Sequence, residues 1–379
     1  MSEENNDSNS SYSPFRGQGG RIIIAGGGTG GHIFPALAIA NAIKKIAPET
    51  QILFVGAKGK MEMEKVPQAG YEITGLDIVG FNRSSLIKNI GLPYKILKSF
   101  LQVQKIFKSF KPDAVVGVGG YSSFPVLRYA QHRAIKTFLH ESNSFAGKAN
   151  VMLGKRATEI FTASDGMEKF FPKEKTLLTG NPIRKNILLS IQHEDAIKFF
   201  ALNDNKKTVL AIGGSLGAKS INEAIATHID DFAKNNLQLI WQTGSTTIDQ
   251  FKHLTAGRNN IWISDFIAEM KYAYAAADMV VARAGAMTIA ELVAVKKPSI
   301  LIPYPFAAED HQTANAMNLV KKDAAIMVKD NEAKEKLMAT IIDLSKNEAL
   351  QNILKQNISS LAINNADDVI ANEILKSIN

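Results

Sequence analysis

Arg21-Ile-Ile-Ile-Ala25 leads into Gly26-Gly-Gly-Thr-Gly-Gly31 and then into an apolar segment from Pro35 to Ile46. The isoleucines predict a buried strand, the glycines a tight loop, and Pro35 is typical of a first helical turn. The order recurs in mid-chain, where a strand over Thr208–Ile212 precedes Gly213-Gly-Ser-Leu-Gly217 and another helix. The chain is therefore predicted to hold two α/β halves, each opening with a glycine loop.

Further apolar runs continue both halves. They are Gln51–Val55, Ala114–Val118 and Thr137–Leu139 in the first half, and Leu237–Gln242, Ile261–Ser264, Met279–Val281 and Ser299–Ile302 in the second. Helical segments separate the runs, so each half is predicted to be a parallel, Rossmann-like sheet with crossover helices. We place the boundary near Asn181-Pro182, with a linker to about Ser190. The last helix, Asp367–Ile378, could pack on either half.

Composition limits the function classes. The 379 residues include no cysteine, which excludes disulfides, thiolate nucleophiles and cysteine-ligated metals and suits the cytoplasm. The net charge of +8 favours an anionic partner such as nucleic acid, a phosphorylated substrate or an acidic membrane. Residues 1–20 are expected to form a disordered tail, and they lack the apolar stretch of a signal peptide. Because no apolar run is long enough to span a bilayer, any membrane contact should be peripheral.

The first glycine loop ends in Gly30-Gly31-His32. A strand–loop–helix unit of this kind favours a bound anion. A dinucleotide site would also place an acid at the end of the second strand, but that strand ends Val55-Gly56-Ala57-Lys58, which argues against an oxidoreductase. His32, with no acid beside it in the motif, has an intrinsic pKa suited to taking a proton from a hydroxyl. The alternative is a hydrogen-bonding residue at a helix start.

The second glycine loop, Gly213-Gly-Ser-Leu-Gly-Ala218, offers the Ser215 hydroxyl as well as backbone N–H groups. We interpret it as a diphosphate cradle, with a plain Rossmann turn as the alternative. Two such loops in one chain predict a ligand held in the cleft between the halves.

Seven motifs in order resemble the MurG family of UDP-N-acetylglucosamine:lipid-linked muramyl-pentapeptide transferases, from Arg21 to about Ala366. They are Gly26-Gly-Gly-Thr-Gly-Gly-His-Ile-Phe-Pro35, Gly117-Val-Gly-Gly-Tyr121, His140-Glu-Ser-Asn143, Gly180-Asn-Pro-Ile-Arg184, Gly213-Gly-Ser-Leu-Gly-Ala218, Arg283-Ala-Gly-Ala-Met-Thr288 with Glu291, and Asp310-His-Gln-Thr-Ala-Asn315. The resemblance implies glycosyltransferase-B architecture. Residues 21–183 plus 361–379 would form an acceptor and membrane-binding domain, and residues 184–360 a UDP-GlcNAc-binding domain.

The resemblance also implies an activity. It is the inverting transfer of GlcNAc from UDP-GlcNAc to the C4 hydroxyl of undecaprenyl-diphospho-MurNAc-pentapeptide, which converts lipid I to lipid II in peptidoglycan synthesis. The expected location is peripheral, on the cytoplasmic face of the inner membrane, against an anionic surface. Cell-wall synthesis or division proteins are candidate partners, nucleic acid is not, and no cofactor is expected. No Asp-x-Asp pair occurs in the sequence, so we expect no catalytic metal.

The resemblance assigns roles to individual residues. His32 is the expected general base, with Glu141 as the next candidate. Thr29, Gly30, Gly31, Tyr121, Glu141 and Asn143 would surround the acceptor and its diphosphate, and Arg184 would meet phosphate at the junction or form a linker salt bridge. On the donor side, Ser215 would bind the diphosphate, Glu291 the ribose, Phe266, Ile267 and Met270 the uracil, and Gln312 and Asn315 the GlcNAc hydroxyls. Arg283, charged in an apolar run, needs an anionic or acceptor partner.

Two departures from the family pattern limit these assignments. Leu216 stands where many members carry Gln, and the segment Asp310–Asn315 is shorter than in some relatives. The main rival function is a UDP-GlcNAc 2-epimerase, which shares architecture and donor. A sugar-nucleotide sensor without catalysis and an oxidoreductase are the others.

A basic, apolar segment is the predicted membrane contact. Residues 78–112 carry seven Lys and Arg and no acid. Within Phe81–Tyr94, we expect Leu86, Ile87, Ile90 and Leu92 to face an anionic bilayer beside Arg83 and Lys88. The helix that follows, with Ile96, Phe100, Val103 and Phe107 on one face, is expected to contribute that face to the core.

Overall fold

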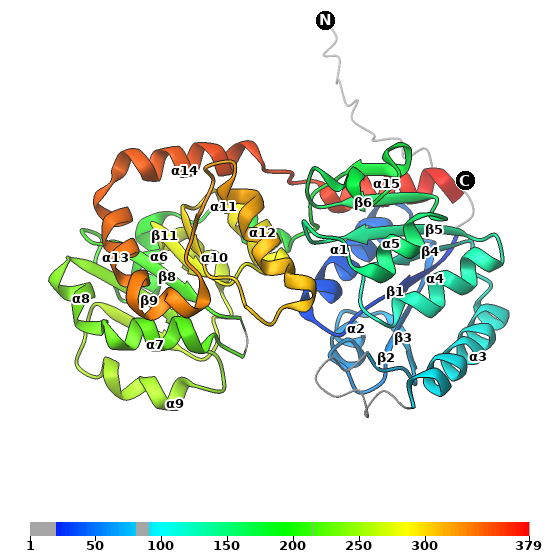
Figure 1. The fold of residues 1–379 in the computed structure, drawn as a ribbon, viewed down its shortest axis with the longest axis horizontal. Helices are drawn as coiled ribbons and strands as arrows, with labels where there is room; N and C mark the ends of the chain where they lie inside the picture. Colours follow the sequence, from blue (N-terminus) through cyan, green and yellow to red (C-terminus); the bar gives the residue numbers. More distant parts are fainter. Residues whose placement is uncertain (1–19, 81–90, 215, 379) are drawn as a thin grey trace, which may run out of the picture.

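The computed structural model describes residues 20–80, 91–214 and 216–378, which form two α/β lobes side by side (Figure 1). The first lobe holds a seven-stranded sheet in the order β3-β2-β1-β4-β5-β6-β7. Its strands are β1 (Arg21–Ala25), β2 (Gln51–Ala57), β3 (Glu72–Leu76), β4 (Ala114–Gly117), β5 (Lys136–Glu141), β6 (Glu159–Thr162) and β7 (Thr176–Leu178). Every pairing is parallel, as the alternation of strands and helices predicts.

Helices cover both faces of this sheet. They are α1 (Gly30–Ile46), α2 (Glu62–Gln68), α3 (Leu92–Phe110), α4 (Ser123–His132) and α5 (Lys148–Gly154). Ile22 and Ile24 of β1 pack toward α1, whereas Ile23 and Ala25 pack toward α3, α4 and α5. This alternation buries β1 on both sides, which explains why its sequence is apolar without interruption.

The second lobe repeats the plan with a six-stranded parallel sheet in the order β10-β9-β8-β11-β12-β13. Its strands are β8 (Lys207–Ile212), β9 (Leu237–Gln242), β10 (Ile261–Ser264), β11 (Met279–Ala282), β12 (Ser299–Leu301) and β13 (Ile326–Met327). Its helices are α6 (His193–Phe199), α7 (Lys219–Thr227), α8 (Ile229–Lys234), α9 (Ile248–Phe251), α10 (Met270–Ala276), α11 (Ala286–Val295), α12 (His311–Val320), α13 (Ala333–Lys346) and α14 (Glu348–Ser360). The predicted fold class, two Rossmann-like domains, is confirmed.

The last helix, α15 (Ala366–Ile378), answers a question that the sequence left open. After α14 the chain crosses back to the first lobe, and α15 packs along α1 (Figure 1). Ile370, Ile374 and Leu375 join the apolar core on that face of the first sheet. The two lobes are therefore linked by two crossings of the chain, one before β8 and one before α15.

Two expectations about local structure need correction. Helix α1 begins at Gly30, not at Pro35, because Thr29 with its extended backbone already serves as the N-cap. Pro35 lies inside the helix, which therefore lacks the hydrogen bond from residue 35 to the Gly31 carbonyl. The prediction also missed β3, β6, β7 and β13. These strands have only two to five residues, and β3, β6 and β7 each begin with Glu or Thr, so their apolar runs are short. Strand β13 has two residues, too few to stand out within the short apolar segment Ala324–Val328.

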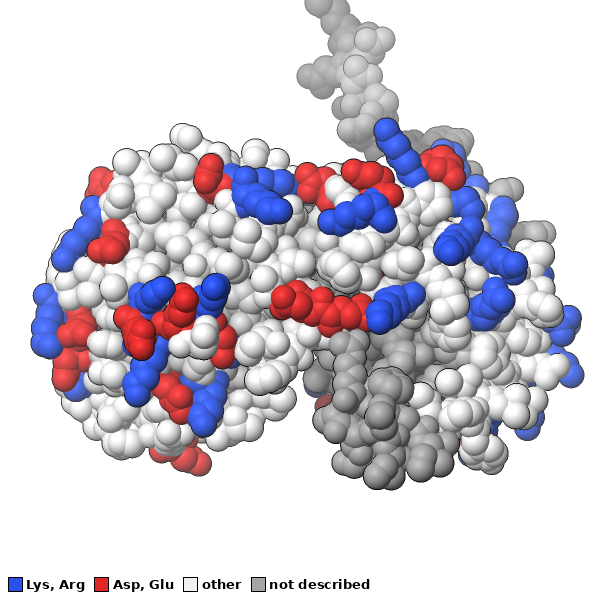
Figure 2. Space-filling view, in the orientation of Figure 1, with Lys and Arg blue, Asp and Glu red and all other residues white. Residues whose placement is uncertain are grey.

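The surface and the helices bear on membrane contact. Among the residues that the structure describes, no helix is both long and apolar enough to cross a bilayer. The predicted membrane segment falls largely on residues 81–90, which lie outside the described residues. On the face drawn in Figure 2, most of the charged side chains on the right of the first lobe are Lys or Arg, whereas the second lobe mixes both signs.

Candidate active site

The first glycine loop connects β1 to α1 at the carboxyl edge of the sheet. Gly26, Gly27 and Gly28 all have positive φ, and the loop crosses the turn that follows β4. There the Gly27 N–H donates to the Gly119 carbonyl at 3.3 Å. A Cβ on Gly120 would lie 2.4 Å from the Gly27 carbonyl oxygen, so these two turns can touch only as glycines.

His32 lies in the first turn of α1 and turns its ring back onto this loop. Its Nδ1 is 3.1 Å from the Gly27 carbonyl oxygen and 3.4 Å from the Thr29 hydroxyl. A carbonyl oxygen can only accept, so Nδ1 carries the proton and Nε2 is left as the basic nitrogen. The tautomer required of a general base is thus set by the loop.

Burial lowers the pKa of His32 below its ordinary value of 6.5, while the charge of Glu141 and the bond to Gly27 act in the opposite direction. The lowered pKa keeps the imidazole neutral at pH 7. A neutral imidazole is the form that can accept a proton, which agrees with the role expected for His32.

Glu141 has a different environment from that of a free base. Its Oε1 accepts from the backbone and side-chain nitrogens of Asn143, at 3.1 and 3.2 Å. Its Oε2 accepts from Gly147 N at 3.2 Å and Asn150 Nδ2 at 2.8 Å. Four donors hold a buried carboxylate, which indicates that Glu141 shapes the loop after β5. The structure does not support it as the alternative base.

Tyr121 is in contact with the same loop. Its ring lies 3.1 Å from the position of a Cβ on Gly80 and 3.7 Å from that of a Cβ on Gly28. Thr29, Gly30, Gly31 and His32 follow directly, so the structure brings together most of the residues predicted for the acceptor side.

The second glycine loop opens onto a cavity of about 810 Å³. Apart from its chain neighbours, no atom of the described residues lies within 4 Å of the position of a Cβ on Gly214, whose φ is +82°, so the loop backbone there faces open space. Helices α7 and α11 both start at the cavity, and their N-terminal N–H groups favour an anion. Ser215, the predicted diphosphate ligand, lies outside the described residues.

Arg283 and Gln312 line this cavity, and both have partners. The Arg283 guanidinium pairs with the Asp330 carboxylate, donates to Ser220 Oγ at 3.1 Å, and lies over the ring of Tyr304. The partner required by a charge in an apolar run is therefore Asp330. Gln312 Oε1 accepts from Tyr304 N at 2.9 Å, which leaves its amide nitrogen for a ligand.

Asn315, one turn further along α12, is separated from Gln312. It is buried at the contact of the two lobes, where its Oδ1 accepts from Ser144 N at 2.8 Å. Its Nδ2 donates to Asn143 Oδ1 and to the Ala284 carbonyl, each at 3.1 Å. We expected Gln312 and Asn315 to bind the same sugar. In this structure the Asn315 amide is instead bonded to residues of both lobes.

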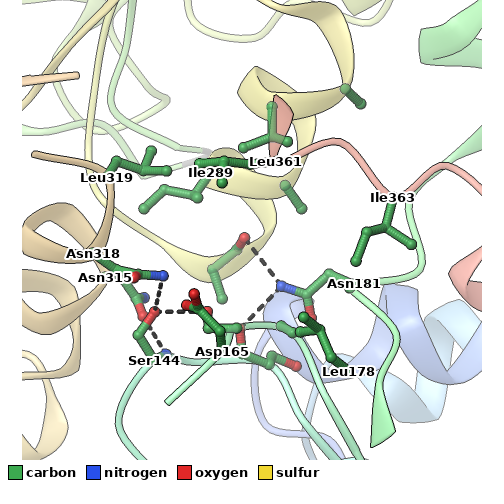
Figure 3. A pocket seen from close by; sticks show the side chains of 18 of the residues that line it. Ser144, Asp165, Leu178, Asn181, Ile289, Asn315, Asn318, Leu319, Leu361 and Ile363 are labelled. Carbon is green, nitrogen blue, oxygen red and sulfur yellow. Dashed lines mark hydrogen bonds between the residues drawn. The ribbon is translucent and has the colours of Figure 1, made fainter. Parts of the chain in front are cut away.

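A second cavity, of about 200 Å³, lies between the lobes beside Asn315 (Figure 3). Asn181 lines it from the first lobe and donates to the Ser142 carbonyl at 3.0 Å and the Ala286 carbonyl at 3.4 Å. Asn318 Nδ2 donates to Ser144 Oγ at 3.3 Å. The predicted junction residue Asn181 thus bonds to both lobes.

Glu291 and Arg184 form a pair at the same junction, with Arg184 NH2 3.0 Å from Glu291 Oε1. The other Glu291 oxygen accepts from the Tyr274 hydroxyl at 2.9 Å. Burial, together with this carboxylate, raises the pKa of Tyr274 well above 10. Arg184 also lies over the ring of Phe34. The salt-bridge interpretation of Arg184 is the one that the structure supports, and Glu291 does not line the glycine-loop cavity.

The three predicted uracil contacts divide into two kinds. Ile267 and Met270 are buried members of the second-lobe core. Phe266 is 54% exposed and is the one free to cover a base. The Ile267 N–H is already donated to Gln242 Oε1 at 2.9 Å.

Glu62 is the residue that the sequence analysis missed on the acceptor side. Its carboxylate is 1% exposed and lies beneath the first glycine loop, where it accepts from Gly28 N at 2.8 Å. An acid from outside the motif therefore lies near enough to His32 to raise its pKa. Glu62 comes five residues after β2 ends. The sequence analysis looked for an acid only at the end of that strand, over Val55–Lys58. An acid between two methionines, Met61 and Met63, was the available signal.

Comparison with known proteins identifies both lobes. Residues 22–162 match the model of the glycosyltransferase family 28 N-terminal domain, and residues 208–372 that of the C-terminal domain. A Parabacteroides distasonis protein is 48% identical over 94% of this chain and 98% of its own length. Its name is UDP-N-acetylglucosamine--N-acetylmuramyl-(pentapeptide) pyrophosphoryl-undecaprenol N-acetylglucosamine transferase.

Solved structures place the fold in the same group. The crystal structure of Acinetobacter baumannii MurG has a TM-score of 0.77 and 28% identity, covering 94% of this chain and 99% of that one. A UDP-N-acetylglucosamine 2-epimerase has a TM-score of 0.62 at 13% identity, covering 95% and 97%. The epimerase likeness extends to the fold alone. The chain belongs to glycosyltransferase family 28 and, within it, to the MurG family of N-acetylglucosaminyltransferases.

Proposed function

We propose that this enzyme transfers GlcNAc from UDP-GlcNAc to the C4 hydroxyl of undecaprenyl-diphospho-MurNAc-pentapeptide, with inversion at the anomeric carbon. The product is lipid II, the precursor used in peptidoglycan synthesis. The observation that carries the proposal is the division of labour between the glycine loops. One presents a neutral imidazole with its basic Nε2, and the other opens onto a cavity with two helix N-termini.

The proposed reaction uses His32 as the base. Nε2 takes the proton of the acceptor C4 hydroxyl while its oxygen attacks the anomeric carbon of GlcNAc. The bond to the β-phosphate oxygen of UDP breaks, and the diphosphate leaves with its negative charge. The N–H groups of the Gly213–Gly217 loop and of the α11 N-terminus stabilise that charge.

Different residues bind the different parts of the donor UDP-GlcNAc. Ser215 and the loop backbone bind the diphosphate, Phe266 covers the uracil, and the free amide of Gln312 binds a sugar hydroxyl. Glu291 has acceptor capacity left for the ribose, because each of its carboxylate oxygens receives one donor and can accept a second. Displacement of Arg184 would make further room at little cost, because that guanidinium is partly exposed.

The two lobes take separate substrates in this proposal. Residues 21–183 with 361–379 form the acceptor domain, and residues 184–360 form the donor domain. The packing of α15 on α1 supports the first grouping. Tyr121 and Asn143 then border the acceptor.

Membrane binding completes the proposal, with the enzyme held on the cytoplasmic face by an anionic surface. The expected core face of α3 is buried at Val103 and Phe107. The opposite side exposes Tyr94, Leu97 and Leu101. Helix α3 contains no acid and carries Lys95, Lys105 and Lys108, together with Lys98, which pairs with Asp77 of the preceding segment. Exposed apolar side chains among cations suit an anionic bilayer, where each cation contributes about 1 kcal/mol.

The experiment is transfer of radiolabelled GlcNAc to lipid-linked MurNAc-pentapeptide in vesicles. Labelled lipid II should form, and free UDP should appear in equal amount. Incubation with UDP-GlcNAc alone should give no UDP-ManNAc. Formation of UDP-ManNAc without transfer to lipid would show that the protein is an epimerase. Binding of UDP-GlcNAc without either product would show that it is a sugar-nucleotide sensor.

A further inference from the structure

The carboxylate of Glu62 has no role in the reaction proposed above, yet the first glycine loop is built around it. Glu62 opens α2, and its two oxygens accept from Gly28 N at 2.8 Å and from Ala57 N at 3.0 Å. A Cβ on Gly27 would lie 2.3 Å from the Glu62 carboxyl carbon, and a Cβ on Gly56 would lie 2.5 Å from its Cγ. Glycines at these two positions therefore make room for a side chain of the protein itself.

One peptide unit joins this carboxylate to His32. The N–H of Gly28 and the C=O of Gly27 belong to the same peptide group. Glu62 accepts from the N–H end of that group, and the carbonyl end accepts from His32 Nδ1 at 3.1 Å. A continuous path of hydrogen bonds thus runs from a buried negative charge, through one planar amide, to the ring of the proposed base.

The path has a direct electrostatic consequence. A carboxylate that accepts from a peptide N–H polarises the amide and makes its carbonyl oxygen a better acceptor. The bond from His32 Nδ1–H is then stronger, which fixes the ring orientation and favours the tautomer with a basic Nε2. The imidazolium formed on proton transfer is stabilised in the same way. In a Ser-His-Asp triad the Asp does this by direct contact with Nδ1.

We propose that Glu62 is a positioning residue for His32, acting through the Gly27–Gly28 peptide to orient the imidazole and stabilise its charged form during the transfer. The proposal rests on the proposed function, in which His32 is the base. Glu62 itself touches neither substrate nor the reacting atoms.

Other charged groups face His32 and must be held constant in any test. Glu141, at the end of β5, raises the pKa of His32, and His311, at the start of α12, lowers it. His140 in β5 is coupled to His32 as well. Glu62 acts with Glu141, in the direction that favours the imidazolium. Of these groups, Glu62 is the one that the described structure links to the ring through a hydrogen-bonded peptide.

The test is a double-mutant cycle of Glu62→Gln and His32→Ala in the lipid transfer assay. Glu62→Gln should lower kcat roughly 10- to 100-fold, which is part of a general-base contribution. It should also shift the acid limb of the pH–kcat profile to lower pH, because a negative charge near the imidazolium is lost. The affinity for UDP should not change. In the His32→Ala background, Glu62→Gln should change kcat less than twofold.

Glu64→Gln is the matched control, because Glu64 lies on the same helix and its carboxylate is exposed beside Lys65. It should keep wild-type kcat and pH profile. A full Glu62→Gln effect that persists in the His32→Ala background would show that Glu62 only supports the fold, and wild-type kcat in Glu62→Gln would also overturn the proposal. Wild-type kcat in His32→Ala would instead show that His32 is not the general base.

A measurement without any variant covers the case in which Glu62→Gln fails to fold. The ¹⁵N resonances of the His32 ring in the wild-type enzyme report which nitrogen is protonated. Protonation at Nδ1, with a slowly exchanging proton, is expected. A ring protonated at Nε2 would overturn the proposal.

Discussion

The two glycine loops look alike in sequence and occupy equivalent places in their sheets, yet they enclose different things. The first is filled from below by Glu62 and from the side by the Gly119–Gly120 turn. The second has open space at Gly214 and borders a cavity of about 810 Å³. A run of glycines therefore shows that something approaches the backbone closely, but it does not show whether that is a ligand or the protein's own side chain.

The largest expected effect tests the chemical role of the first loop. His32→Ala should lower kcat by about 10²–10⁴-fold, the usual contribution of a general base, and leave the affinity for UDP-GlcNAc nearly unchanged. Transfer kinetics and calorimetric titration measure the two quantities. His253→Ala, an exposed histidine of the second lobe, is the control and should match the wild type. A loss of donor affinity in His32→Ala would remove the functional contrast between the loops.

The next effect is the pH dependence of the free energy of unfolding that His140 of the first lobe causes. Burial lowers the pKa of His140 to about 4 from an unfolded value near 6.5. Because only the unfolded state binds a proton between these values, the free energy of unfolding should fall as pH drops from 6.5 to 4, by about 3 kcal/mol in total. Urea unfolding at pH 7 and pH 4.5 measures this fall. His140→Gln should reduce it, and an equal fall in the variant would assign it to other groups, namely His32 and the carboxylates.

A third prediction compares one added methyl group in each loop. Gly27→Ala should destabilise the fold, because its Cβ would overlap the Glu62 carboxyl group. Gly214→Ala meets no protein atom and should cost only about 1–2 kcal/mol for its left-handed backbone, yet it should weaken UDP binding. Thermal unfolding and UDP titration separate the two outcomes. Unchanged UDP affinity in a folded Gly214→Ala protein would mean that the diphosphate does not lie against this loop.

A smaller effect distinguishes Gln312, which lines the donor cavity, from Glu291, which lies at the junction of the lobes. Gln312→Ala should weaken UDP-GlcNAc by about 1 kcal/mol and leave UDP unchanged, because one hydrogen bond to the sugar is lost. Glu291→Ala should weaken both ligands alike if Glu291 binds the ribose. It should also lower the melting temperature, because Arg184 and Tyr274 lose their partner. Equal losses of UDP binding in the two variants would refute this division.

The smallest expected effect is none. If the helix N-termini and loop amides stabilise the leaving diphosphate, transfer should continue at an unchanged rate in excess EDTA. Loss of activity in EDTA, restored by added magnesium, would show that the second loop holds its diphosphate through a metal ion.

Much of the fold was predictable because its signals are local. The runs Leu237–Gln242 and Ile261–Ser264 were predicted with the bounds that the structure gives, because both are short and rich in Leu, Ile and Trp. The short strands β7 and β13 were not, because their pairing depends on neighbours in the sheet. In the site, His32, Arg283 and Gln312 were found from their motifs, whereas Glu62 and Asp330 stand outside any motif.

The sequence by itself determined two Rossmann-like halves, the family, and the residue types at both glycine loops, because these depend on periodicity and on short motifs. Only the tertiary structure decided that α15 belongs with the first sheet and that Asn315 joins the lobes. It alone placed the Glu62 carboxylate one peptide unit from His32. These three facts are contacts between segments distant in the chain, and spacing along a sequence carries no measure of distance across a fold.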